Sequence, residues 1–162
     1  PIEAAAYRQH VLGRELSGYD ADLISLQELT HAPYRCLAAV LASEGLRGEY
    51  AEPSMLANKG SGGTQELAFF WREALLTRVD SAAWHVGRLL LEPHAAPLRA
   101  LLEASSPSLA EFVRGQPHVA HAIVLRQQAE AEAEARHVVA VNLHLVMHAL
   151  ASNVRTLQAE LV

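Results

Sequence analysis

The stretch that most constrains the fold is Ala21–Glu28, with the sequence Ala-Asp-Leu-Ile-Ser-Leu-Gln-Glu. The run Leu23–Leu26 is apolar except for Ser25, which is small enough to sit inside a sheet. Such a run predicts a short β-strand covered on both faces, as in a sheet packed under helices. The strand ends abruptly in the polar pair Gln27–Glu28, which places a carboxylate at the rim of a sheet.

A carboxylate held rigidly at a strand end is a suitable ligand for a hard metal such as Mg²⁺. This ion binds one or two carboxylates together with substrate phosphates. The alternative interpretation is that Glu28 is merely the first residue of the loop that follows the strand. The octapeptide alone leaves both interpretations open and makes Glu28 a candidate metal ligand.

The composition predicts one globular domain. The chain has 162 residues, of which 51% are hydrophobic and 19% charged, enough for a single sizeable core. Its net charge of -5 gives no basic excess to follow a nucleic-acid backbone, so any nucleic acid must be met in a local pocket, with metal ions supplying positive charge. The lone Cys36 excludes an internal disulfide framework, and no apolar run reaches membrane-spanning length.

Helical and strand patterns are mixed along the chain. Apolar spacing and Gly or Pro boundaries predict helices over residues 4–17, Tyr34–Ser43, a region around Leu98–Leu102, a short segment from Pro107, and Ala151–Leu161. Strands are predicted before Glu28, at Gly48–Tyr50, at Leu67–Arg72, at Leu75–Val79 as a continuation of the same sheet, at Val119–Gln127 as an interior strand, and at Arg136–Leu145. Residues 52–65 are predicted to be a connecting loop and residues 129–135 a solvated hairpin connection.

A second apolar strand also ends in polar residues, Asn142 and His144. If this strand and the strand before Glu28 lie in one pair of sheets and point the same way, the three side chains converge on one rim. His144 would then donate a hydrogen bond to a phosphate oxygen or a developing oxyanion, and Asn142 would fix the geometry. The alternative for His144 is a core or rim histidine that is satisfied by backbone carbonyls.

Other chemistries lack the residue patterns that they require. The remaining histidines show no arrangement with cysteine or carboxylates that indicates zinc. A Cys-His pair and a Gly-Xaa-Ser-Xaa-Gly elbow are both missing, so nucleophilic catalysis has no support. Phe70 and Trp71 have the rings to stack on a base, although aromatic residues in such a strand are more often core.

Several motifs together resemble one family. Residues 15–28 pair a Gly-Tyr-Asp-Ala-Asp lead with Leu-Gln-Glu, and Gly45–Tyr50 reads Gly-Leu-Arg-Gly-Glu-Tyr. Leu67–Arg72, Val141–Leu145 and residues 154–158, with an Arg-Xaa-Xaa-Gln pattern, follow in order. This series resembles the endonuclease/exonuclease/phosphatase superfamily. Within it, the series is similar to the deadenylase-like branch, which includes nocturnin and the angel proteins, and most of all to the mitochondrial 2′,5′-phosphodiesterase.

The resemblance implies an α/β (α+β) fold of two packed mixed β-sheets flanked by helices in a four-layer sandwich. It also implies Mg²⁺-dependent phosphodiester hydrolysis by water. The position matching Glu28 would bind the metal and the position matching His144 would contact the scissile phosphate, with Asn142 and His148 binding substrate. The implied substrate is oligoadenylate or a poly(A) tail, shortened from its 3′ end.

The chain departs from the family pattern in ways that predict a partial domain. The family's early strand with an Asn, its Gly-Asp-Xaa-Asn strand and its final Asp-His pair have no counterpart in residues 1–162. Since the Asp-His pair is the source of the general base, and such a base is worth ~10²–10⁴-fold, we expect these 162 residues alone to be inactive. We also expect an open sheet edge that a protein partner or the missing half would cover.

Three hypotheses of function follow. The first is a fragment of a Mg²⁺-dependent phosphodiesterase or 3′-exoribonuclease, mitochondrial by its nearest relative and otherwise cytoplasmic. The second is a catalytically inactive relative that serves as a structural subunit of an RNA–protein assembly. The third, a phosphatase of small molecules or lipids, is disfavoured by the Gly18-Tyr19 lead and by Arg155 and Gln158.

Overall fold

The computed structural model describes residues 2–51, 66–116, 118–129, 135–146 and 151–162, and the fold below refers to these. The helices are α1 (Ile2–Gly18), α2 (His31–Ser43), α3 (Val86–Leu89), α4 (Ala96–Ser105), α5 (Pro107–Gly115) and α6 (Ser152–Glu160), with a 3-10 turn, η2, at Pro93–Ala95. The strands are β1 (Leu23–Gln27), β2 (Leu46–Tyr50), β3 (Leu67–Arg72), β4 (Leu76–His85), β5 (Val119–Gln127) and β6 (His137–Leu143). None of the helices described is long and apolar enough to cross a membrane.

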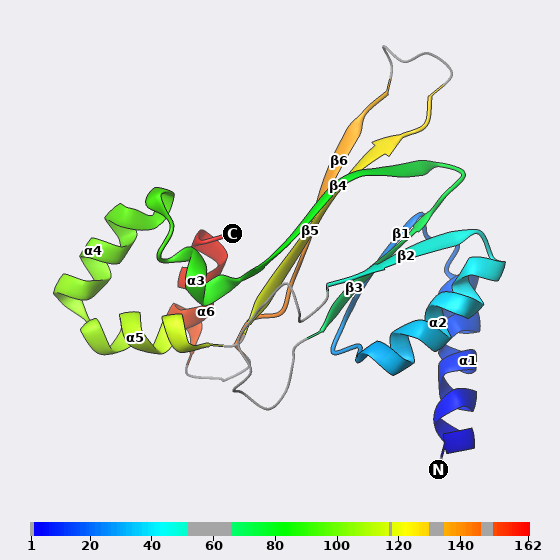
Figure 1. The fold of residues 1–162 in the computed structure, drawn as a ribbon, viewed down its shortest axis with the longest axis horizontal. Helices are drawn as coiled ribbons and strands as arrows, with labels where there is room; N and C mark the ends of the chain where they lie inside the picture. Colours follow the sequence, from blue (N-terminus) through cyan, green and yellow to red (C-terminus); the bar gives the residue numbers. More distant parts are fainter. Residues whose placement is uncertain (1, 52–65, 117, 130–134, 147–150) are drawn as a thin grey trace.

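The strands form two three-stranded sheets that pack face to face (Figure 1). Sheet A has the order β1-β3-β2 and sheet B the order β4-β5-β6. All described pairings are antiparallel, whereas mixed sheets were expected. The predicted arrangement of two packed sheets flanked by helices is confirmed.

The aromatic strand β3 lies at the centre of sheet A because its side chains are apolar on both faces. Phe70 and Ala68 face α1 and α2 and join the cluster around Leu37 and Leu41. Phe69 and Trp71 face sheet B and pack on Ile123 and Leu125 of β5, which forms the apolar contact between the two sheets. The side chains of Phe70 and Trp71 are therefore core, so their stacking on a base receives no support.

Strand β1 differs from the prediction that it is covered on both faces. It is an edge strand, and of its residues only Ile24 is buried, while Ser25 is exposed. The covered position in the sheet is taken by β3, which pairs with β1 through Ile24 and Phe70 and with β2 through Gly48 and Phe70. The longer and more aromatic segment buries more apolar surface there.

The prediction that Leu75–Val79 continues the first sheet is wrong. After Arg72, the chain makes a short turn, in which Leu75 N–H donates to the Arg72 carbonyl, and crosses to the other sheet as β4. There Leu76 pairs with Gln127 of β5. Strand β5 was predicted to be an interior strand, and its place between β4 and β6 confirms this.

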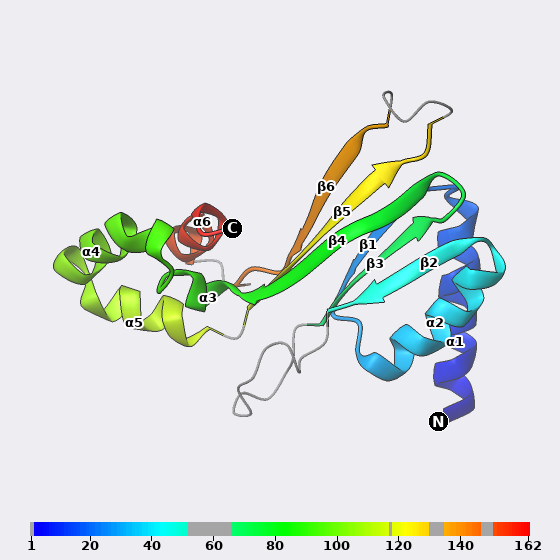
Figure 2. The same ribbon diagram turned by 45° about the horizontal axis from the view of Figure 1, so that its top comes forward.

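The helices of the two halves are placed differently. Helices α1 and α2 cover one face of sheet A, whereas α3 to α6 gather beyond one end of the sheet B strands (Figures 1 and 2). The latter group has its own core around Val86, Leu90, Val113 and Val154, with Ala120 of β5 reaching into it. The fourth layer expected from the resemblance thus covers only the end of sheet B. The loop predicted at residues 52–65 and most of the hairpin connection at 129–135 lie outside the described residues.

Candidate functional site

The carboxyl ends of β1 and β6 are tied together by side-chain amides across the two sheets. The Asn142 amide nitrogen donates to the Leu26 carbonyl at 2.8 Å and lies 3.3 Å from the Ala68 carbonyl. Gln27 donates to the Leu143 carbonyl at 2.9 Å and to the Asn142 side-chain oxygen at 3.3 Å. Since Asn142 is buried on sheet B and its side-chain partners all belong to sheet A, its amide fixes how the two strand ends lie relative to each other.

Glu28 follows β1 directly and adopts a left-handed backbone conformation with φ of 56°. A residue other than glycine adopts this conformation at a cost of about 1–2 kcal/mol, so it persists only where the surroundings impose it. The next residue, Leu29, is held by its N–H, which donates to the Glu66 carbonyl at 3.2 Å. The sharp turn leaves the Glu28 side chain 68% exposed at the rim.

His144 lies just past β6, opposite Glu28. Its Nε2 atom is 3.5 Å from a carboxylate oxygen of Glu28, and its side chain is only 11% exposed. The other ring nitrogen, Nδ1, is buried and has no hydrogen-bond partner among the residues that the structure describes. The ring thus presents its Nε2 side to the Glu28 carboxylate.

A Mg²⁺ ion fits the carboxylate of Glu28 in donor type and accessibility. The oxygen atoms are exposed and of the hard type that Mg²⁺ prefers, and this ion keeps several waters and binds substrate phosphates beside one or two carboxylates. In the described part of the chain, no group of three or more His, Cys, Asp or Glu residues is placed to hold a metal ion. Water and substrate would therefore complete the coordination at Glu28.

The structure brings together three of the four residues that the sequence singled out. Glu28, Asn142 and His144 meet at one rim, although their strands belong to different sheets. His148 lies outside the described residues. The side-chain amide of Asn142 is hydrogen-bonded within the protein, which agrees with a role in fixing the geometry of the rim. Direct contact of Asn142 with substrate stays a prediction.

Two buried histidine contacts were not found by the sequence reasoning. His118 binds Gln158 through Nδ1 at 2.9 Å, behind the rim, and His121 binds Glu49 through Nε2 at 3.2 Å, between the sheets. Burial lowers the pKa of His118, and the charge of nearby His144 lowers it further. Neither pair forms a local motif, since their members are 40 and 72 residues apart along the chain.

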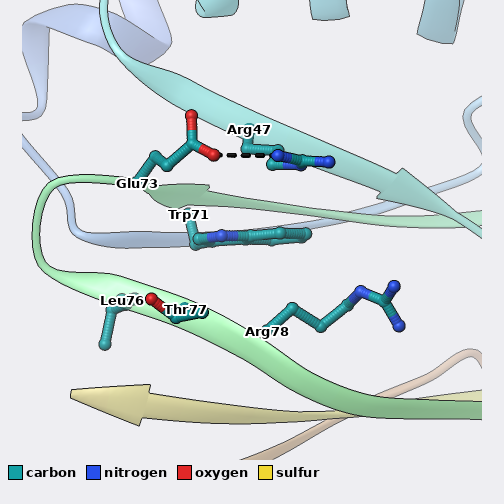
Figure 3. Close-up of a pocket in the computed structure, with 6 residues that line it drawn as sticks. All are labelled: Arg47, Trp71, Glu73, Leu76, Thr77 and Arg78. Carbon is teal, nitrogen blue, oxygen red and sulfur yellow. Dashed lines mark hydrogen bonds and ion pairs between the residues drawn. The ribbon is translucent and has the colours of Figure 1, made fainter. Parts of the chain in front are cut away.

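A separate pocket of about 170 Å³ opens at the other edge of the two sheets, between β2 and β4 (Figure 3). Its lining residues are Arg47, Trp71, Glu73, Leu76, Thr77 and Arg78. The charged groups there are already paired, Arg47 with Glu73 at 2.8 Å and Arg78 with Glu49 at 2.9 Å. The pocket therefore offers no uncompensated charge to a ligand, and the rim at Glu28 and His144 is the better candidate site.

Comparison with known proteins shows the fold through solved structures. No family model matches the chain, and none of the curated proteins matches it. A crystal structure of ANGEL2, a 2′,3′-cyclic phosphatase, in complex with adenosine-2′,3′-vanadate matches 93% of this chain with a TM-score of 0.64 and 15% identity. The human Nocturnin catalytic domain with bound sulfate matches 94% with a TM-score of 0.59 and 18% identity.

A functionally unknown conserved protein from Enterococcus faecalis V583 is also similar, with a TM-score of 0.61, 18% identity and 96% of this chain covered. The chain spans only 35% of the ANGEL2 structure, 47% of the Nocturnin structure and 50% of the bacterial one. The likeness therefore shows that these 162 residues share the fold of the matching parts of these structures.

Proposed function

We propose that the protein to which this chain belongs is a Mg²⁺-dependent phosphodiesterase or 3′-exoribonuclease that acts on oligoadenylate or poly(A) RNA. One observation carries the proposal: Glu28 and His144, which are 116 residues apart in the sequence and follow strands of different sheets, lie 3.5 Å apart at one rim. A carboxylate and an imidazole at a sheet rim are the groups that bind a metal ion and a phosphate oxygen.

Each residue of the rim has a role in this proposal. Glu28 would hold Mg²⁺, which when bound supplies positive charge to polarise the phosphoryl oxygens and offset charge on the leaving group. His144 would donate its Nε2 proton to an oxygen of the scissile phosphate once the Glu28 carboxylate is engaged by the metal. The amides of Gln27 and Asn142 keep the two strand ends in register for this contact. His148 is proposed to bind substrate on the strength of the family resemblance alone.

The chemistry of the structural neighbours supports an RNA phosphate as substrate. ANGEL2 is described as a 2′,3′-cyclic phosphatase, with a crystal structure in complex with adenosine-2′,3′-vanadate, while the structure of the Nocturnin catalytic domain has a bound sulfate anion. Adenosine and a phosphate-like anion therefore suit relatives of this fold. With a net charge of -5, this chain would meet RNA at the rim, where the metal supplies the positive charge. A mitochondrial location is part of the proposal, with the cytoplasm as the alternative.

A second candidate is an inactive relative that serves as a structural subunit of an RNA–protein assembly. The observation that favours it is the sparse donor set, because the described residues bring no third metal-binding side chain to Glu28 and His144. In that case the rim would be a remnant of an active site, and its substitution would leave the biological function intact.

The test is hydrolysis of 2′,5′-linked and 3′,5′-linked oligoadenylate and of a 2′,3′-cyclic phosphate end by the longest natural form of the protein. Glu28→Gln is the test variant, and Glu44→Gln, at an exposed position after α2, is the matched control. Release of product that stops with EDTA and in Glu28→Gln, but continues in Glu44→Gln, would support the enzyme. No release by the folded wild-type protein would overturn it in favour of the structural subunit.

A further inference from the structure

Helix α6 binds both the backbone N–H and the backbone carbonyl of a residue just beyond His144. The Gln158 side-chain oxygen accepts the Val146 N–H at 3.2 Å, and the Arg155 guanidinium donates to the Val146 carbonyl at 3.4 Å. Val146 is only two residues after His144. The position of the His144 ring along the rim therefore depends on where α6 places this short segment.

Gln158 is itself hydrogen-bonded to His118, the residue just before β5. Because a backbone N–H can only donate, the contact with Val146 fixes the oxygen end of the Gln158 amide, and the NH₂ end must donate to His118 Nδ1 at 2.9 Å. Nδ1 is then the acceptor and the ring proton of neutral His118 lies on Nε2. The geometry thus defines one tautomer of this histidine.

The contact lies in the interior of the protein. Gln158 is fully buried and His118 is 3% exposed, and the His118 carbonyl also accepts the Val86 N–H at 2.9 Å. A buried polar group that loses its partner costs about 1–3 kcal/mol, so the link from β5 through Gln158 to Val146 tends to stay complete. The lowered pKa of His118 favours the uncharged ring, and only the uncharged ring has an Nδ1 lone pair that can accept the hydrogen bond from Gln158.

The ring of His144 needs such support from its backbone. Imidazoles at functional sites are usually oriented by a hydrogen bond to the second ring nitrogen. The Nδ1 atom of His144 is buried without a partner among the described residues. What fixes this ring is therefore the packing around it and the path of residues 144–146.

We propose that His118 and Gln158 form a positioning pair that sets the place of His144 in the site by holding the Val146 backbone. The proposal rests on the proposed function for its consequence in hydrolysis, but its structural part can be measured separately. In the described part of the structure, the contact between His118 and Gln158 is separate from the contact between Glu28 and His144, so both are positioning residues and not catalytic ones.

The structural test uses NMR of the longest natural form. The wild type should show His118 as the Nε2–H tautomer, and the Val146 amide should exchange slowly. Gln158→Met, which keeps the volume but removes both contacts, and His118→Leu should speed Val146 exchange at least ~10-fold, the equivalent of one lost buried hydrogen bond. His118→Asn keeps an acceptor near the place of Nδ1 and should restore most of the protection.

The kinetic test measures kcat and KM on oligoadenylate with the same variants. Loss of a group that orients a site residue typically costs ~10–100-fold, so kcat should fall by this factor in Gln158→Met and His118→Leu, with KM within about twofold of wild type and partial rescue in His118→Asn. Val154→Ala is the control, because it weakens the apolar packing of the same helix without touching the polar link.

Three results would overturn the positioning pair: wild-type exchange at Val146 in Gln158→Met, equal behaviour of His118→Leu and His118→Asn, or a proton on His118 Nδ1. If Gln158→Met does not fold, the tautomer of His118 in the wild type and the comparison of the two His118 variants still test whether the positioning pair exists. If the wild-type protein does not hydrolyse oligoadenylate, the proposed function is wrong. The amide-exchange and tautomer data would still support or refute the positioning pair.

Discussion

Glu28 carries both the candidate metal-binding carboxylate and a left-handed backbone, with φ of 56°. Such a conformation costs a residue with a side chain about 1–2 kcal/mol, and strain of this kind gathers at functional sites. Glycine adopts the conformation freely but loses about 0.5–1 kcal/mol through its larger unfolded-state entropy. Replacement of Glu28 by glycine should therefore relieve the backbone strain while it removes the carboxylate.

We therefore predict that Glu28→Gly raises the free energy of unfolding by about 0.5–1 kcal/mol and abolishes the proposed hydrolysis by the longest natural form of the protein. Urea unfolding and the oligoadenylate assay measure the two effects. Asp20→Gly is the matched control, since Asp20 also has a left-handed backbone, with φ of 49°, but lies away from the rim. Asp20→Gly also removes the exposed ion pair of Asp20 with Arg72, at 2.7 Å, so its gain in stability should be smaller than that of Glu28→Gly, and it should keep activity. A loss of stability in Glu28→Gly would contradict the argument.

Glu49 joins the two sheets through charge. It lies on β2, and its carboxylate contacts His121 of β5 at 3.2 Å and Arg78 of β4 at 2.9 Å. Burial alone would raise the pKa of Glu49. Hydrogen bonds from His121 and Ser81 and the charge of Arg78 outweigh burial and hold the pKa below the ordinary 4.5. The folded protein therefore binds this proton less readily than the unfolded chain does.

The lowered pKa of Glu49 makes the free energy of unfolding depend on pH. The stabilisation by Glu49 is complete above about pH 4.5 and is lost as the pH falls through the lower pKa of the folded state. We predict that Glu49→Gln lowers the free energy of unfolding at pH 7 by about 1–2 kcal/mol and flattens its decline below pH 4.5. Urea titrations at a series of pH values check this, and a parallel decline in wild type and Glu49→Gln would refute it.

The sequence predicted part of the site for a physical reason. Glu28 and His144 each follow an apolar strand, and a strand end at a rim is visible as a change from apolar to polar residues. The contacts of His121 with Glu49 and of His118 with Gln158 have no such local signal. They depend on the register of β5 and on where α6 packs, which only the assembled fold determines.

At the scale of elements, the packing of β2 on β3 depends on the lack of a side chain at Gly48. A Cβ atom at this position would lie 2.5 Å from Cε1 and 2.7 Å from Cδ1 of Phe70, and 3.1 Å from the Tyr34 hydroxyl. Phe70 is fully buried in the centre of sheet A. The ring and β2 would have to separate.

We predict that Gly48→Ala lowers the free energy of unfolding by about 1–3 kcal/mol, the usual cost of overpacking a core. Thermal unfolding of the two proteins measures the difference. Gly18→Ala is the control, because no atom lies within 4 Å of the added Cβ at the end of α1. A change in Gly48→Ala no larger than that in Gly18→Ala would disprove the close approach.

The elements themselves were largely predictable, but their assignment to sheets was not. The strand at Leu67–Arg72, the helix around Leu98–Leu102 and the helix that begins at Pro107 are confirmed, because apolar spacing and proline positions mark them locally. The pattern of the segment from Leu76 also predicts a strand, but it does not indicate with which other strand this one pairs. Its pairing with β5, 51 residues along the chain from Leu76 to Gln127, places it in sheet B.

At the scale of the whole molecule, sheet B presents an apolar outer face at its edge strand β6. Val139 is 66% exposed and Val141 48%, and they lie on one face because residues two apart in a strand point the same way. Among the described strands, β6 pairs only with β5. An exposed apolar edge strand invites pairing with another chain.

We predict that the isolated 162 residues self-associate through β6 and that Val139→Lys with Val141→Lys shifts them toward the monomer. Charges on an edge strand oppose pairing between sheets, and substitution of exposed residues changes stability by only about 0.5 kcal/mol. Light scattering after size-exclusion chromatography measures the mass, and unfolding checks the fold. Leu101→Lys is the control, because Leu101 is 64% exposed but lies on α4, away from β6. A wild-type chain that stays monomeric at high concentration, or an equal shift with Leu101→Lys, would show that the β6 edge does not drive association.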